Sequence, residues 1–101
     1  LAMAAYVKAG MDGVRKKLDP GEPNIGRNMY EMSAAQLKKR GVKVLPQHLG
    51  EALDALERDP VVQSALGEPL YREFLSVKRE ECAQYNRTVS PWEVNRFLTA
   101  L

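Results

Sequence analysis

The residues whose side chains could carry reaction chemistry are few in this 101-residue chain. His48 is the single histidine and Cys82 the single cysteine, so neither a His-based zinc site nor an internal disulfide can be built. His48 lies beside a predicted helix start, and there it needs neither an orienting partner nor a nucleophile. Cys82 follows Glu80 and Glu81 without an adjacent base, which disfavours its thiolate. We therefore predict structural roles for both residues.

The sequence also has no clear motif for binding a phosphate group or a metal ion. No glycine is followed by the Lys-Ser or Lys-Thr pair of a Walker-type loop, so no nucleotide cradle is visible. Glu22 and Glu31 are the best candidates for paired carboxylates, but nothing places them at a common site, and we interpret both as solvated loop residues. Ser33 and Ser90 have predicted helix-capping roles. We predict no catalytic, cofactor-binding or metal-binding residue in this chain.

The charge balance argues against a nucleic-acid or membrane partner. Fifteen basic and 13 acidic residues give a net charge of only +2. The basic runs 15–17 and 38–40 lie at predicted helix C-termini, where cations complement the helix dipole; a phosphate-binding patch is the alternative. Residues 1–7 are apolar but too short to span a bilayer, and they lack the features of a secretory signal. With a single cysteine, the expected compartment is the reducing cytoplasm.

Helical periodicity covers nearly the whole sequence and predicts an all-α fold. Two capping boxes, Ser33 with Gln36 and Ser90 with Glu93, predict two of the helix starts. Residues 42–46 should form an extended connection, and the Asp59-Pro60 step should interrupt the amphipathic helix that begins at residue 49. A chain of this size buries only ~65% of its unfolded surface and is marginal when alone. The expected helices cover residues 1–17, 33–40, 49–58, 60–66, 69–86 and 91–101.

Apolar stripes on these helices predict which faces are covered. The many small residues of segment 1–17 indicate a helix packed closely against other backbone, not a surface helix. The longest helix should bury one stripe and expose Lys78, Arg79, Glu80 and Glu81. The last helix has an apolar face that nothing else in the chain is left to cover, so we predict that it contacts an oligomer partner. The buried stripe is Tyr71, Phe74, Leu75, Cys82 and Tyr85, and the predicted oligomer contacts are Trp92, Val94, Phe97, Leu98 and Leu101.

The connection between the first two predicted helices is the most informative segment. Leu18-Asp19-Pro20-Gly21-Glu22-Pro23 is a rigid non-helical linker, and Asn28-Met29-Tyr30-Glu31 follows it. With the flanking segments 9–14 and 45–56, this order and spacing resembles the C-terminal segment of the glutamine synthetase family over the whole chain. The resemblance implies that residues 1–101 are the helical C-terminal part of an α+β catalytic domain. Because the chain opens in mid-helix pattern without Met, we expect a segment of a longer protein.

The resemblance also implies an activity, which belongs to the longer parent enzyme. Such an enzyme couples ATP cleavage to amide formation on glutamate, with Mg²⁺ or Mn²⁺ at the transferring phosphate. All residues for this chemistry would lie outside the 101 given, so the chain alone should be inactive. It would support the active-site barrel formed by the remainder of the catalytic domain. It would also help to assemble a homo-oligomer, a dodecamer of two stacked rings in the bacterial branch.

Two finer points follow from the same resemblance. Tyr30 stands where many bacterial members have a tyrosine that receives an adenylyl group, although Met29, Met32 and Ser33 differ from their Asn-Leu-Tyr-Asp-Leu-Pro pattern. The alternative is that Tyr30 packs against the adjacent helix with its hydroxyl outward. The ending, residues 88–98, resembles the type III branch, whose acceptors include methylamine and polyamines. The acceptor is therefore open between ammonia and a primary amine.

A different class of function remains as the alternative. The chain would then be a free-standing helical interaction module without catalysis. Its apolar C-terminal face would bind a partner helix.

Overall fold

The computed structural model describes residues 1–100 and shows helices joined by loops, without a strand among those residues. The all-α prediction is confirmed. The predicted helix ends agree with the structure to within two residues, except that the last helix ends at Phe97 and not near residue 101. The one-turn 3₁₀ helix η1 was not predicted. Leu101 lies outside the described residues. The elements are α1 (Ala2–Arg15), η1 (Met29–Glu31), α2 (Ala34–Lys39), α3 (Leu49–Glu57), α4 (Pro60–Leu66), α5 (Glu68–Arg87) and α6 (Pro91–Phe97).

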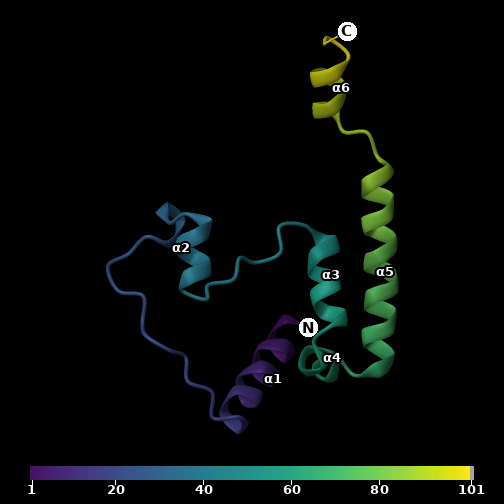
Figure 1. Ribbon diagram of the computed structural model, residues 1–101. Coiled ribbons are helices and arrows are strands. Elements are labelled where there is room, and N and C mark those ends of the chain that lie inside the picture. Colours follow the sequence, from purple (N-terminus) through teal and green to yellow (C-terminus); the bar gives the residue numbers. More distant parts are fainter. Residues whose placement is uncertain (101) are drawn as a thin grey trace.

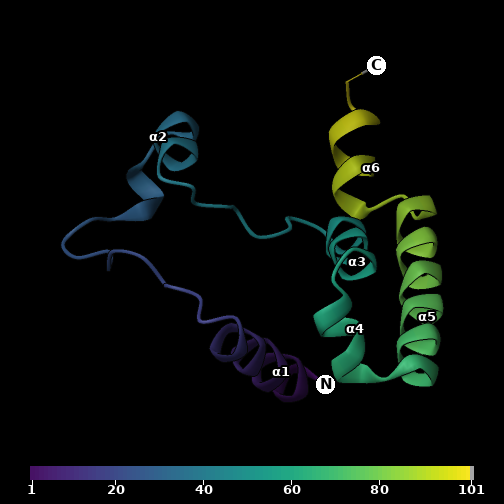
Figure 2. The ribbon, with the colours of Figure 1, turned by 60° about the horizontal axis from the view of Figure 1, so that its bottom comes forward.

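The helices are arranged in an open form. Helices α3 and α5 lie side by side, α4 joins them, and α1 packs on α4, whereas α2 stands apart at the end of two long connections (Figures 1 and 2). The radius of gyration is 18.7 Å, against about 13 Å for a compact domain of this length. The accessible surface is 9037 Å², roughly 3,300 Å² more than a compact protein of this mass exposes. Much of the apolar surface is therefore uncovered.

Local side-chain caps explain where several helices begin. Ser33 Oγ accepts a hydrogen bond from the Gln36 amide (3.4 Å), and Gln36 Oε1 accepts one from the Ser33 amide (2.8 Å). Ser90 and Glu93 repeat this arrangement at α6, at 3.2 and 2.7 Å. Both predicted capping boxes are confirmed. Asp59 caps α4 by accepting from two backbone amides, at 3.0 and 3.1 Å.

The core is small and lies between α3 and α5. Leu53 of α3 is 2% exposed and is the one buried apolar residue among residues 1–100. Two predictions for α5 are wrong: Tyr85 is 79% exposed, whereas Lys78 and Arg79 are half-buried, and Arg79 contacts α3. Nine residues of α3 extend about 14 Å and twenty of α5 about 30 Å. Helix α3 is thus too short to cover the end of α5 that carries Tyr85.

Helix α1 differs from its predicted packing. It contacts α4 along one face, but its larger apolar side chains stay exposed, Met3 to 79% and Val7 to 63%. Met3, Val7 and Met11 line an open groove of about 450 Å³ together with residues of α4. The prediction of a closely packed helix is wrong for the described chain, because α4 is only seven residues long and covers a single face.

One turn is set by backbone geometry. Gly67 ends α4 and begins α5 with φ +78° and ψ 153°. This region of backbone space is open to glycine and strained for other residues. Gly67 therefore turns the chain at the α4–α5 corner.

Candidate functional site

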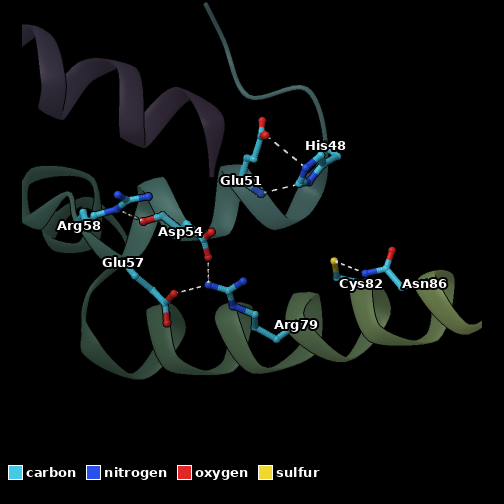
Figure 3. Close-up of polar contacts among 8 residues, drawn as sticks. All are labelled: His48, Glu51, Asp54, Glu57, Arg58, Arg79, Cys82 and Asn86. Atoms are coloured by element: carbon cyan, nitrogen blue, oxygen red, sulfur yellow. Dashed lines mark hydrogen bonds and ion pairs between the residues drawn. The ribbon is translucent and has the colours of Figure 1, made fainter.

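A polar cluster joins α5 to α3 (Figure 3). Arg79 Nη2 donates to Asp54 Oδ1 at 2.6 Å and also to Glu57 Oε2. The hydrogen bond from Arg79 is the main reason why the pKa of Asp54 is lowered, and the two acids raise the pKa of Arg79. The side chains of Asp54 and Arg79 are 52% and 38% exposed. Because the charges are paired, the cluster offers no free base and functions as a cross-link.

Sequence reasoning missed this cross-link because it placed Arg79 on the polar outer face. The available signal was the spacing of Asp54 and Glu57, one turn apart at the border of the apolar face of α3. Such a pair of acids can accept hydrogen bonds from one guanidinium on a neighbouring helix, as both do here from Arg79 Nη2.

His48 caps helix α3, as its predicted structural role requires. Its Nδ1 accepts a hydrogen bond from the Glu51 amide at 3.3 Å, and its Nε2 lies 3.3 Å from Glu51 Oε1. With Nδ1 engaged by backbone, the ring has no free lone pair on that nitrogen for a general base.

Cys82 faces the same end of α3. A Cβ at Gly50 would lie 3.3 Å from His48 Nδ1 and 3.7 Å from Cys82 Sγ, so this glycine lets α5 approach the cap closely. Cys82 Sγ accepts from Asn86 Nδ2 at 3.7 Å. The contacts made by Cys82 are those of a packed thiol.

The acidic side chains of the described residues do not gather into a metal site. Among residues 1–100, no three or more His, Cys, Asp or Glu side chains gather in a way that could hold an ion. Glu31 accepts a hydrogen bond from Asn28 Nδ2 at 3.0 Å, whereas Glu22 lines a separate loop cavity beside Pro20. The structure thus gives these two acids different surroundings, and no reaction step can be assigned to them.

Tyr30 projects from the 3₁₀ helix η1. Asn28 caps this helix, since its Oδ1 accepts from the Tyr30 amide at 3.1 Å. The Tyr30 residue is 100% exposed. The alternative that Tyr30 packs against the adjacent helix is therefore wrong for the described chain. Its hydroxyl is fully open to solvent.

Helix α6 carries the predicted oligomer contacts, and they are exposed. Trp92 and Phe97 form an edge-to-face pair with ring centroids 6.2 Å apart. Trp92, Phe97 and Leu98 are 67%, 58% and 70% exposed, and Val94 is 39% exposed. Val94, Phe97 and Leu98 line an open hollow of about 380 Å³. Leu101, the fifth predicted contact, lies outside the described residues.

These features define a class of protein segment. It is an open helical element with uncovered apolar faces, and its described residues hold no group of three or more potential metal ligands. None of the helices in residues 1–100 is both long and apolar enough to cross a membrane. A sequence model described as "Glutamine synthetase, catalytic domain" matches residues 1–97. The chain belongs to the glutamine synthetase family.

Three relatives show how the match extends. The chain is 57% identical over 98 residues to "Glutamate--methylamine ligase" of Methyloversatilis universalis, covering 97% of this chain and 22% of the relative. It is 45% identical over 98 residues to "Glutamine synthetase" of Thermus thermophilus, with the same coverage. Against "Glutamine synthetase" of Halobacterium salinarum it is 44% identical over 98 residues, 97% of this chain and 21% of the relative. The chain thus spans about a fifth of the length of these relatives.

Proposed function

We propose that residues 1–101 form the C-terminal helical part of a glutamine synthetase catalytic domain within a longer ATP-dependent ligase. The observation that carries this proposal is the match of residues 1–97 to the catalytic-domain family. The open form of the chain supports it, because roughly 3,300 Å² of excess surface needs a cover. That amount is comparable to an obligate interface.

The parent enzyme would join the side-chain carboxylate of glutamate to an amine. ATP would phosphorylate this carboxylate, Mg²⁺ or Mn²⁺ would neutralise the phosphoryl group, and the amine would displace phosphate. For the acceptor we propose methylamine, because identity to the methylamine ligase is 57% against 44–45% for the two synthetases named above. The residues of this chain would support the fold and would not touch the reacting atoms.

The test is an assay of the full-length protein that contains this chain. Phosphate release would be measured with ATP, magnesium and glutamate, with either methylammonium or ammonium as acceptor. We expect release that depends on glutamate, with a higher kcat/KM for methylammonium. A higher kcat/KM for ammonium would overturn the proposal that methylamine is the acceptor. If neither amine gave phosphate release, the proposed ligase activity would be wrong. In a separate titration, the isolated chain should not bind ATP.

We also propose that α6 contributes to assembly of a cytoplasmic homo-oligomer, a dodecamer of two stacked rings. The exposed stripe Val94, Phe97 and Leu98 supports this role. The alternative, a free-standing interaction module, makes a different prediction for the 101-residue chain. A module should unfold in one cooperative transition, whereas a segment with so little core should lose structure gradually on heating.

Tyr30 is the proposed site of an optional adenylyl modification. Its full exposure and its place in Asn28-Met29-Tyr30-Glu31 support this assignment. Intact-mass measurement on protein from nitrogen-rich and nitrogen-poor cells tests it. The added mass of one adenylyl group should appear in the wild type and be absent from Tyr30→Phe. An unmodified wild type under both conditions would overturn the assignment.

A further inference from the structure

The end of α2 carries an unusual concentration of unpaired positive charge. Lys38, Lys39, Arg40 and Lys43 lie within six residues, and this basic segment 38–43 includes no acid. Among residues 1–100, none of the four forms an ion pair with a carboxylate. The other basic run differs, because two of its cations pair with an acid on their own helix. Arg15 lies 3.0 Å and Lys16 2.6 Å from Asp12.

These cations are not needed to satisfy the end of the helix. Gly41 adopts φ +70°, the Gly41 amide donates to Lys38 O at 3.0 Å, and the Val42 amide donates to Leu37 O at 3.0 Å. This pair of bonds is a Schellman motif, which satisfies the carbonyls of Leu37 and Lys38 with backbone alone. The predicted dipole role therefore accounts for only part of the charge, and it does not apply to Lys43, which lies beyond the helix.

The basic segment also borders an apolar groove. Leu37, Val42 and Val44 line a hollow of about 280 Å³ together with Lys38 and Lys43. Val44 is 68% exposed at its edge. In both views α2 stands apart from the other helices of the described chain (Figures 1 and 2), and all residues that line the groove lie within 34–44.

We propose that this groove with its basic segment is a docking surface for an acidic protein segment that places an apolar side chain between its carboxylates. The carboxylates would pair with the four cations, and the apolar side chain would cover Leu37 and Val44. A nucleic acid fits less well, since its phosphates would leave the apolar floor uncovered and the groove has no aromatic residue for base stacking. The surface is separate from α6 and goes beyond the proposed ligase function.

The test uses the full-length protein and a fluorescein-labelled peptide of alternating glutamate and leucine as the probe. Anisotropy would be measured at low and at physiological salt. In Lys38→Gln/Lys43→Gln we expect binding to weaken by about two- to thirtyfold, since two exposed ion pairs are lost. The matched control is Lys8→Gln/Lys17→Gln, which removes the same charge from α1 and its end and should bind as the wild type does. Val44→Ser should weaken binding without changing its salt dependence.

Three results would overturn the proposal. They are equal weakening in the control variant, equal affinity for a polyglutamate of the same charge without leucine, and tighter binding of a single-stranded oligonucleotide. Ligase turnover should be unchanged in Lys38→Gln/Lys43→Gln. A wild type without ligase activity would refute the proposed function but would leave the peptide measurement interpretable.

Discussion

Arg79 of α5 and Asp54 of α3 are 25 positions apart in sequence, yet their side chains meet at 2.6 Å. Glu57 shares the same guanidinium nitrogen. This contact lies beside Leu53, the one buried apolar residue of the described chain. The packing of α3 on α5 therefore combines a very small apolar core with one exposed cross-link.

The first prediction concerns pH. The folded-state pKa of Asp54 is lowered, chiefly by its hydrogen bond with Arg79, so its stabilising effect is present above the unfolded value and is lost as the pH falls through the folded one. The free energy of unfolding should therefore drop below about pH 4. In Asp54→Asn this part of the pH dependence should disappear. Denaturation of the full-length protein from pH 7 to pH 3 measures it.

The control for this measurement is Glu73→Gln on the exposed face of α5. It removes an acid that lies outside the cross-link. If Glu73→Gln flattened the pH dependence as much as Asp54→Asn, the contact with Arg79 would not be its cause.

The second prediction concerns the core. Leu53→Ala should destabilise the packing of α3 on α5 by about 2–5 kcal/mol, the usual range for a buried leucine. Leu49→Ala is the matched change on the same helix, at a residue that is 40% exposed, and should cost clearly less. Urea denaturation of both variants decides between them. Equal losses would show that Leu53 is not the centre of this contact.

The third prediction concerns the start of α6. Ser90→Ala removes the cap and should cost about 0.5–2 kcal/mol of helix stability. Glu93→Gln should be nearly neutral, because glutamine can also complete a capping box. Hydrogen exchange of the amides of residues 93–97 should accelerate in Ser90→Ala and stay close to wild type in Glu93→Gln. The opposite order would refute the assigned cap.

The fourth prediction concerns assembly. Burying Phe97 and Leu98 is worth about 1.5–3 kcal/mol each, so Phe97→Asp/Leu98→Asp should dissociate the parent oligomer while preserving subunit helicity. Asn95→Asp/Thr99→Asp adds the same charge at polar positions of the same segment and should leave assembly intact. Sedimentation velocity reports both. An unchanged oligomer in the first variant would remove α6 from the interface.

The fifth prediction concerns Tyr30. Because its side chain is wholly exposed and packs on nothing in the described chain, Tyr30→Phe should leave basal ligase turnover within about a factor of two. The turnover of the variant would be compared with that of the wild type, both under high-nitrogen and under low-nitrogen conditions. A large loss under both conditions would place Tyr30 in the active site.

Local features of the fold were predictable, because a few neighbouring residues determine them. Ser33 with Gln36 and Ser90 with Glu93 form their caps within four residues, and the structure confirms both. The 3₁₀ helix η1 was missed although Asn28 was a local signal for it.

The inner face of α5 was less predictable, because it depends on the partner helix. The sequence pattern of α5 alone predicts that Arg79 is solvated, because its partners Asp54 and Glu57 lie on another helix. The same pattern predicts that Tyr85 is buried, but α3 is too short to cover it. At the candidate site, the role of His48 followed from its position. The groove beside Lys38 and Lys43 could not be predicted from the sequence, because it forms only when α2 and the segment after it are folded against each other.

The isolation of α2 has a thermodynamic consequence. Residues 16–33, which include η1, and residues 40–48 connect α2 to α1 and α3, and α2 stands apart from the other helices of the described chain (Figure 1). Free-energy effects of substitutions in α2 and in the α3–α5 pair should therefore add within about 0.3–0.5 kcal/mol. For the same reason, selection on the surface of α2 can act without altering the stability of the helices that surround Leu53.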